Sequence, residues 1–352
     1  MSDSAIRYAA LPLQVTCQAV NRCADTQQAR ARIMESIAHC DDLILGSRQF
    51  ASTFRGDTVR LVVLPEYFMT GFPMGESVAE WQEKACIREG GPEYEALGRL
   101  AQNHGVYLSG NAYEVDKHFP ELYFQTSFII SDAGNVILRY RRLISMFAPT
   151  PHDVLDSYLD VYGQDGLFPV VETELGRLAC VASEEILYPE ITRAHALRGA
   201  EVICHSSSEV GSPRETPGNI AKQARAYENM VFVVSANTAG IADSSTPNQS
   251  TDGHSQVVDY RGRVLAEAGQ GESMDGYAQA NITALRRTRA KSSMTNTLAR
   301  LRMGVFRQAY DMEPVYPKNT LMSGAGVKSP GRNHYLDTQQ AVIDSLIERG
   351  II

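Results

Sequence analysis

One segment, residues 177–190, constrains the fold more strongly than any other stretch of the chain. It reads Arg-Leu-Ala-Cys-Val-Ala-Ser-Glu-Glu-Ile-Leu-Tyr-Pro-Glu, so that an apolar run ends abruptly at Ser183, two carboxylates follow, and a Pro-Glu pair opens the next element. The pattern predicts a strand that passes through a sharp turn into a helix, with Ser183 at the bend. Enzymes place nucleophiles at such bends, because the backbone there holds the side chain rigidly and leaves it accessible.

Length and charge exclude several classes of protein. The chain has 352 residues, of which 43% are hydrophobic, and this is enough for one large α/β domain or two smaller ones. The formal net charge is −8, and the basic cluster at residues 286–291 stands alone, so we expect no nucleic-acid partner and no membrane partner. No apolar run approaches the roughly 18 to 20 residues that cross a bilayer, and the first residues lack the apolar core of a signal peptide. We therefore expect a cytoplasmic protein.

The six cysteines are scattered along the chain without Cys-x-x-Cys spacing. In a cytoplasmic protein of this size they are expected to be reduced, and Cys180 and Cys204 lie in strand-like runs, as is typical of buried structural thiols. No group of histidines and cysteines has the spacing of a zinc site. We expect neither a metal nor a cofactor.

Strand-like and helix-like runs alternate, with hairpin signals between them, in two similar halves at residues 5–141 and 168–281. The expected strands are residues 7–14, 59–64, 106–112, 127–130, 136–141, 168–171, 177–182, 201–205, 231–236, 256–260, 264–268 and 274–280. The expected helices are residues 25–45, 93–102, 189–198, 220–229, 282–289 and, near the C-terminus, 338–349. A mixed sheet with helices on one face cannot bury both faces alone, so the pattern predicts an α/β fold in which two sheets pack face to face as a four-layer α-β-β-α sandwich.

Three residues stand out because each ends an expected strand. Glu66 follows the run Leu-Val-Val-Leu-Pro, Arg142 follows Leu-Arg-Tyr-Arg, and Ser183 ends the strand described above. Ligands and catalytic groups of open α/β sheets gather at strand ends. We expect these three side chains to converge in one cavity.

Several motifs, in the right order, resemble those of the nitrilase (carbon-nitrogen hydrolase) superfamily. They are Pro65-Glu66 after a buried strand, Tyr140-Arg141-Arg142 after a hairpin, Gly176 to Glu190, Arg225-Ala-Tyr-Glu-Asn, Gly253-His-Ser and Asp259-Tyr-Arg-Gly. The resemblance covers residues 6–285 and implies the α-β-β-α fold for that domain. It also implies a homodimer or larger assembly, in which residues 286–352 form an arm that reaches across subunits.

The resemblance implies a catalytic trio of Glu, Lys and Cys, of which this chain keeps one member. Glu66 matches the family residue, whereas Arg142 stands in the place of the lysine and Ser183 in the place of the cysteine. An alcohol is a poorer nucleophile than a thiol, whose pKa of about 8.5 lets a nearby base ionise it. Glu66 can assist Ser183 if burial raises its pKa. Arg142 can stabilise an oxyanion or grip a carboxylate in two places, but it cannot give up a proton.

These departures leave two hypotheses for the function. The first is a hydrolase that acts on a small amide, carbamoyl or nitrile compound, with Glu66 as base, Ser183 as nucleophile or water-positioning group, and Arg142 as clamp. The second is a catalytically inactive relative that binds a small ligand or a protein partner. A deliberate Cys-to-Ser change at Ser183 is a third interpretation, and the simultaneous change at Arg142 argues against it.

Five further residues are candidates for substrate contacts, each with a structural alternative. They are Tyr67, His152, Glu185, His205 and Glu228. Tyr67 also fits a pocket wall, and Glu185 also fits an anchor for the backbone amides of the Ser183 turn. His152 lies in a proline-flanked loop, His205 ends a strand, and Glu228 also fits a hydrogen-bonded anchor on its helix.

Overall fold

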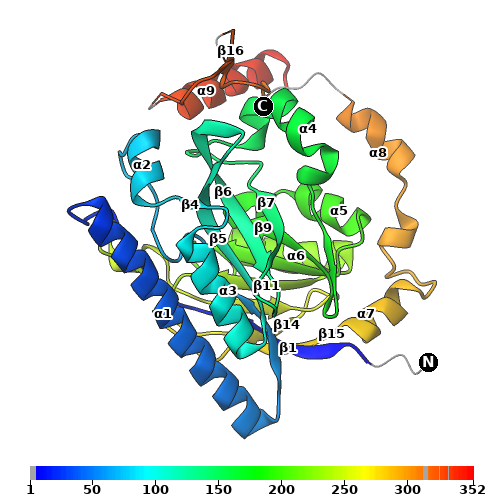
Figure 1. Cartoon of the computed structure of the whole chain (residues 1–352). Coiled ribbons are helices and arrows are strands. Elements are labelled where there is room, and N and C mark those ends of the chain that lie inside the picture. The colour runs from blue at the N-terminus through cyan, green and yellow to red at the C-terminus, as the bar shows by residue number, and fades with distance from the viewer. Residues whose placement is uncertain (1–4, 312–315, 325, 332) are drawn as a thin grey trace.

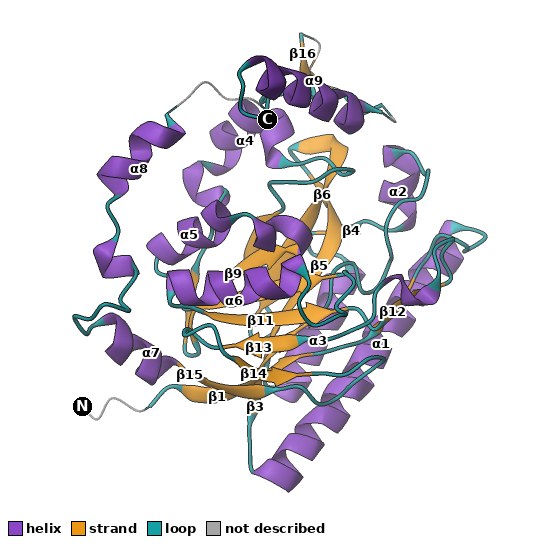
Figure 2. Ribbon diagram, turned by 180° about the vertical axis from the view of Figure 1, so that it is seen from behind, coloured by secondary structure: helices purple, strands orange, loops and turns teal. Residues whose placement is uncertain are grey.

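The computed structural model describes residues 5–311, 316–324, 326–331 and 333–352. Two mixed β-sheets lie face to face, and helices cover the outer face of each sheet (Figures 1 and 2). The expected four-layer α-β-β-α sandwich is therefore confirmed.

The first sheet has parallel strands at its centre and antiparallel strands at both edges. Its order is β15(Ala278–Asn281), β1(Arg7–Pro12), β3(Val59–Val63), β5(Tyr107–Asp116), β6(Phe119–Ile130) and β7(Val136–Arg141), with β4(Ile87–Arg88) paired to β5. Strand β3 is buried on both faces, because Leu61 and Val63 pack towards the second sheet while Val62 packs towards the helices. This double burial explains the unbroken apolar run that precedes Glu66.

The second sheet repeats this plan. Its order is β14(Val264–Glu267), β13(Gln256–Val258), β11(Phe232–Asn237), β10(Val202–Ser207), β9(Gly176–Ala182) and β8(Val171–Thr173). Strands β9, β10 and β11 are parallel, and Cys180 lies directly opposite Cys204 in the ladder. Both thiols are buried in the core between the sheets.

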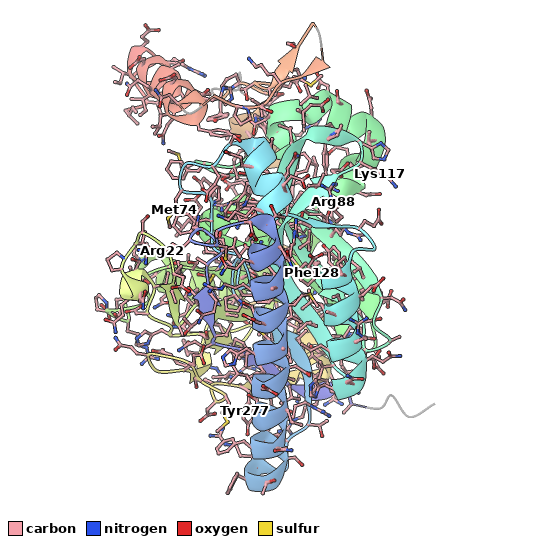
Figure 3. The ribbon with its side chains drawn as sticks, turned by 60° about the vertical axis from the view of Figure 1, so that its left-hand side comes forward. Arg22, Met74, Arg88, Lys117, Phe128 and Tyr277 are labelled. Atoms are coloured by element: carbon pink, nitrogen blue, oxygen red, sulfur yellow. The ribbon has the colours of Figure 1, made fainter. Side chains whose placement is uncertain are left out.

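Four helices form the two outer layers. They are α1(Thr26–Phe50) and α3(Pro92–His104) on the first sheet, and α5(Pro189–Leu197) and α6(Pro217–Asn229) on the second. Helix α1 runs along the length of the molecule (Figure 3), and Asp25 caps it by accepting a hydrogen bond from the Gln28 amide over 2.8 Å. Phe128 of the first sheet, labelled in Figure 3, packs edge-to-face against Tyr94 of α3 with ring centroids 5.2 Å apart.

Two strands differ from the expected arrangement of two similar halves. The last strand, β15, leaves the second half and pairs antiparallel with β1 of the first sheet. Strand β6 is also much longer than the expected 127–130, because it pairs with β5 from Leu108 to Asp116. Neither difference has a local signal, since both depend on pairing with a distant strand.

The C-terminal arm follows α7(Ile282–Arg289) around the outside of the body (Figure 1). Helix α8(Met303–Tyr310) is exposed along its whole length, and the Tyr310 hydroxyl donates to Glu190 of α5 over 2.8 Å. Helix α9(His334–Glu348) matches the expected C-terminal helix and lies near α4(Leu155–Tyr162) at one end of the molecule (Figures 1 and 2). Residues 312–315, 325 and 332 of the expected arm lie outside the described residues. Among the described residues, none of the helices has the length and apolar character to span a membrane.

The remaining elements are short. They are α2(Val78–Lys84), the strand pairs β2(Thr16–Gln18) with β12(Gly240–Ala242) and β16(Met322–Ser323) with β17(Gly326–Val327), the π-helical turn Ala51–Arg55, and 3-10 turns at Pro151–Val154, Gln164–Gly166, Ser183–Leu187, Asn248–Ser250 and Leu298–Arg300.

Candidate functional site

Glu66, Arg142 and Ser183 meet where the strands that carry them end. Glu66 follows β3, Arg142 follows β7 and Ser183 follows β9. The Glu66 carboxylate lies 3.2 Å from Nη1 of Arg142, and the Ser183 hydroxyl lies close enough to the same carboxylate to lower its pKa. The backbone amide of Glu66 also donates to the Ser207 carbonyl over 3.3 Å, which joins the two sheets at this edge. The structure therefore brings together an acid, a guanidinium and an alcohol from distant parts of the chain.

Burial dominates the chemistry of Glu66, which is 2% exposed. Loss of water raises the pKa of the Glu66 carboxyl to about 7, against the lowering effects of Arg142, the Gln125 amide and the Ser183 hydroxyl. A carboxyl with this pKa is divided between its acid and its base form at neutral pH. It can therefore both accept and return a proton there.

Arg142 is enclosed by protein acceptors. Its Nε donates to the Ile144 carbonyl over 2.7 Å, Nη1 donates to Oε1 of Gln125 over 2.7 Å and to Glu66, and Nη2 donates to Oε1 of Glu184 over 2.5 Å. The fork that could grip a ligand carboxylate is thus already held by two carboxylates of the protein. The other Nη2 hydrogen makes no hydrogen bond to the described residues and stays available to a ligand oxygen.

Ser183 begins the 3-10 turn Ser183–Leu187 in a left-handed backbone conformation, with φ of 52°. His205 supports the turn from β10, because its Nε2 lies 2.9 Å from the Ser183 carbonyl oxygen and its Nδ1 lies 2.8 Å from the Ser235 hydroxyl. The carbonyl can only accept, so Nε2 carries the proton and Nδ1 accepts from the serine. Burial lowers the pKa of His205 to about 4, which leaves the ring neutral.

The Glu185 carboxylate holds two loops together beneath the site. It accepts hydrogen bonds from the Tyr140 hydroxyl over 2.8 Å and from the backbone amides of Leu143, Ile144 and Ala182 over 2.6, 3.1 and 3.2 Å. Burial raises the pKa of this carboxyl to about 7. These contacts fix the Ser183 turn against the loop that carries Arg142.

The other three candidate residues make contacts of their own with residues outside the Glu66, Arg142 and Ser183 group. Tyr67 directly follows Glu66 in the chain, and its hydroxyl donates to the Ser208 hydroxyl over 2.8 Å. Glu228 accepts from Arg225 over 2.9 Å on its own helix. His152 faces the ring of Tyr316, with centroids 5.8 Å apart, and has no hydrogen bond to the described residues of the Glu66 centre.

Three residues near the centre, Asn111, Gln125 and Glu184, are not among the site residues that the sequence predicted. The Gln125 amide donates to Glu66 over 2.6 Å and to Asn111 over 3.1 Å, and Glu184 binds Arg142. Gln125 lies within β6, where no local signal marks it as a site residue. Only the position of Glu184, directly after Ser183, could have indicated from the sequence that it belongs to the site.

The described part of the chain offers neither an exposed thiol nor a metal cluster at this centre. All six cysteines are described and buried, and burial raises the pKa of the Cys17 and Cys204 thiols to about 12. No group of three or more His, Cys, Asp or Glu side chains is arranged to hold a metal ion there.

Comparison with curated proteins finds relatives that carry amidase names. A 2-oxoglutaramate amidase of Bacillus subtilis is 29% identical over 214 residues, which cover 61% of this chain and 75% of that protein. Omega-amidase NIT3 of Saccharomyces cerevisiae is 25% identical over 216 residues, which cover 61% of this chain and 72% of that protein.

Solved structures share the fold. Nit3 of Saccharomyces cerevisiae superposes with a TM-score of 0.59 at 22% identity, covering 82% of this chain and 96% of that chain. An amidase from Nesterenkonia sp. superposes with a TM-score of 0.57 at 20% identity, covering 88% of this chain and 98% of that chain. The family model described as carbon-nitrogen hydrolase matches residues 14–290, which include the second sheet, the first sheet without β1, and the Glu66 centre. The chain therefore belongs to the carbon-nitrogen hydrolase family, the nitrilase superfamily.

Proposed function

We propose that this protein hydrolyses a small amide, carbamoyl or nitrile compound with an altered site made of Glu66, Arg142 and Ser183. The proposal rests on one observation: the Ser183 hydroxyl lies beside a buried carboxyl whose pKa is about 7 and which contacts a guanidinium. The amidase names of the relatives favour an amide among the three substrate types.

The chemistry of an amide substrate follows from these positions. The Ser183 oxygen attacks the amide carbon while Glu66 takes the hydroxyl proton, and the free Nη2 hydrogen of Arg142 stabilises the oxyanion. Glu66 then returns the proton to the departing nitrogen, and ammonia leaves an ester on Ser183. A water molecule then gives a proton to Glu66 and attacks the ester carbon, the carboxylic acid leaves, and Glu66 returns the proton to the Ser183 oxygen. Tyr67 and His205 flank this centre as candidate substrate contacts, whereas Glu185 positions the turn.

The family resemblance makes this site atypical, with Arg142 for lysine and Ser183 for cysteine. In a mutant of the Nesterenkonia amidase, the acetamide moiety of fluoroacetamide is bound covalently to the active-site cysteine. In this chain every cysteine is buried, and Ser183 is the accessible group at the corresponding bend. Serine is therefore the nucleophile in our proposal, and turnover is expected to be slower than with a thiolate.

Turnover of a small panel of amides and nitriles tests the proposal. Wild-type protein should hydrolyse at least one amide, and Ser183→Ala should lower kcat/KM by about a hundredfold or more. Glu66→Gln should have a similar effect. Equal activity of the wild type and Ser183→Ala would remove Ser183 from the mechanism.

The second candidate is an inactive relative that binds a small ligand or a protein partner. The four hydrogen bonds that enclose Arg142 favour this candidate. A guanidinium held in this way has little freedom to move towards the negative charge that develops on a substrate oxygen during hydrolysis. Restoring the family residues separates the candidates. Activity that appears only in the double variant Ser183→Cys with Arg142→Lys would support this second function.

We also propose that residues 286–352 make contacts in a homodimer or larger assembly. Four large side chains of α8 support this, because Met303, Val305, Phe306 and Tyr310 are between 45% and 70% exposed. Apolar surface of this kind is typical of an interface. Sedimentation of the wild type and of Val305→Asp with Phe306→Asp should show dissociation in the variant. An unchanged mass would exclude α8 from the interface.

A further inference from the structure

Glu184 occupies the part of Arg142 that faces solvent. Its Oε1 accepts a hydrogen bond from Nη2 of Arg142 over 2.5 Å, while Glu66 and Gln125 hold Nη1. The side chain of Glu184 is 39% exposed, compared with 10% for Arg142 and 3% for Glu66. A ligand that approaches from solvent therefore meets the Glu184 carboxylate before it meets the guanidinium.

Two other cations near the turn are already paired with carboxylates of the protein. Nζ of Lys222, which is 1% exposed, lies 2.7 Å from Oε1 of Glu209, and Nη1 of Arg225 lies 2.9 Å from Oε1 of Glu228. The His205 ring is neutral at physiological pH. Lys222 and Arg225 are thus each paired with a carboxylate, and Arg142 is the cation that contacts Glu66 and the first acid of the Ser183 turn.

The positive charge of Arg142 is itself matched. Glu184 balances it from the solvent side even when Glu66 and Glu185 are protonated, and each of those two adds a negative charge when it ionises. Arg142 and its acidic partners together are thus neutral to negative. A carboxylate on a ligand would be repelled unless it displaced Glu184, whereas an ammonium group would be attracted.

We propose that Glu184 determines substrate charge at this site: it takes the anion-binding position on Arg142, so that the site accepts uncharged or cationic small amides and rejects those that carry a carboxylate. The inference rests on the proposed function, since it names the substrate class of the same centre. The geometry that carries it is the hydrogen bond from Arg142 to an exposed carboxylate of the protein.

Three amides of matched length test this charge preference by calorimetry. They are glutaramate, which carries a carboxylate, valeramide, which is uncharged, and delta-aminovaleramide, which carries an ammonium group. Wild-type protein should bind the last two at least about tenfold more tightly than glutaramate. Glu184→Ala should raise the affinity for glutaramate by about tenfold, lower that for delta-aminovaleramide, and leave valeramide within about threefold. Glu184→Gln, which keeps an acceptor for Arg142 but loses the charge, should fall between the wild type and Glu184→Ala.

Glu172→Ala is the matched control, because it removes an exposed carboxylate from β8, away from the centre. It should change none of the three affinities, and thermal unfolding of all variants verifies that they are folded. The inference is overturned if glutaramate binds the wild type as tightly as valeramide, if none of the three amides binds, or if Glu184→Ala changes the affinity ratios no more than Glu172→Ala. Hydrolysis is measured in parallel. The expected binding preference without hydrolysis would refute the proposed function alone, and hydrolysis with a preference for glutaramate would refute this inference alone.

Discussion

The Glu66 carboxylate and the Arg142 guanidinium lie 3.2 Å apart, although 76 positions separate them in the chain. Both side chains are at least nine-tenths buried. Gln125 bridges them, because its amide nitrogen donates to Glu66 and its amide oxygen accepts from Arg142. The segments that follow two strands of the first sheet thus hold a desolvated pair of side chains within a network of hydrogen bonds. Such a pair is costly to break from one side, because the remaining charge stays buried without a partner.

Arg142→Met should therefore destabilise the fold strongly. We expect a loss of about 3 to 5 kcal/mol in the free energy of unfolding, since Glu66 and Glu184 lose their shared cation. Adding Glu66→Gln to Arg142→Met should recover a large part of this loss at about pH 9, where wild-type Glu66 is ionised, and little of it at pH 5, where Glu66 already holds its proton. Urea denaturation measures both variants. A double variant no more stable than Arg142→Met would contradict the assignment of the loss to the buried charge.

The raised pKa of Glu66 makes stability depend on pH in a defined direction. The folded-state pKa of about 7 lies above the ordinary value of 4.5, so the folded protein holds the proton more tightly than the unfolded chain does. The contribution of Glu66 to stability is fully present below the unfolded pKa and is lost as the pH rises through about 7. Relative to the wild type, Glu66→Gln should gain up to about 3 kcal/mol between pH 5 and pH 8, at about 1.4 kcal/mol per pKa unit. Unfolding curves at a series of pH values measure this change, and a constant difference between the two proteins would refute it.

The Gln125 amide lowers the pKa of Glu66 by donating to its ionised form. Gln125→Met removes this donor, so the acidic limb of the pH dependence of kcat/KM should move upward by roughly half a unit to one unit. Gln256→Met on β13 is the control, because Gln256 is as deeply buried as Gln125, at 1% against 2% exposure, and binds Glu267 instead. The control should leave the limb unchanged. A limb that does not move in Gln125→Met would show that the amide does not tune the base.

The Tyr140 hydroxyl and the Glu185 carboxylate offer a test of how the Ser183 turn is held. Tyr140→Phe leaves a buried carboxylate with one donor fewer and should cost about 1 to 3 kcal/mol of stability. Tyr8 provides a matched control, because its buried hydroxyl has no hydrogen-bond partner among the described residues. Tyr8→Phe should be neutral or slightly stabilising. Thermal unfolding compares the two, and equal losses would mean that the Glu185 contact does not stabilise the turn.

Much of the architecture can be predicted from local patterns. The apolar run before Glu66, the helical spacing of residues 25–45 and the bend at Ser183 all appear as expected, because they reflect contacts within a few positions of the chain. The residues that end these strands were also visible as polar side chains directly after apolar runs. The pairing of β15 with β1 was not visible, since the choice of partner strand depends on the whole packed structure.

The two adjacent carboxylates after Ser183 show the same difference between what the local sequence predicts and what long-range packing decides. The sequence by itself determined that two acids follow the bend and that Glu66 and Arg142 each end a run of β-structure. Only the tertiary structure decided that Glu185 turns inward, to 0% exposure, onto a tyrosine and three amides while Glu184 stays exposed on Arg142. The physical reason is that a sequence pattern encodes which backbone a segment prefers, whereas the burial and the partner of each side chain come from segments far away along the chain.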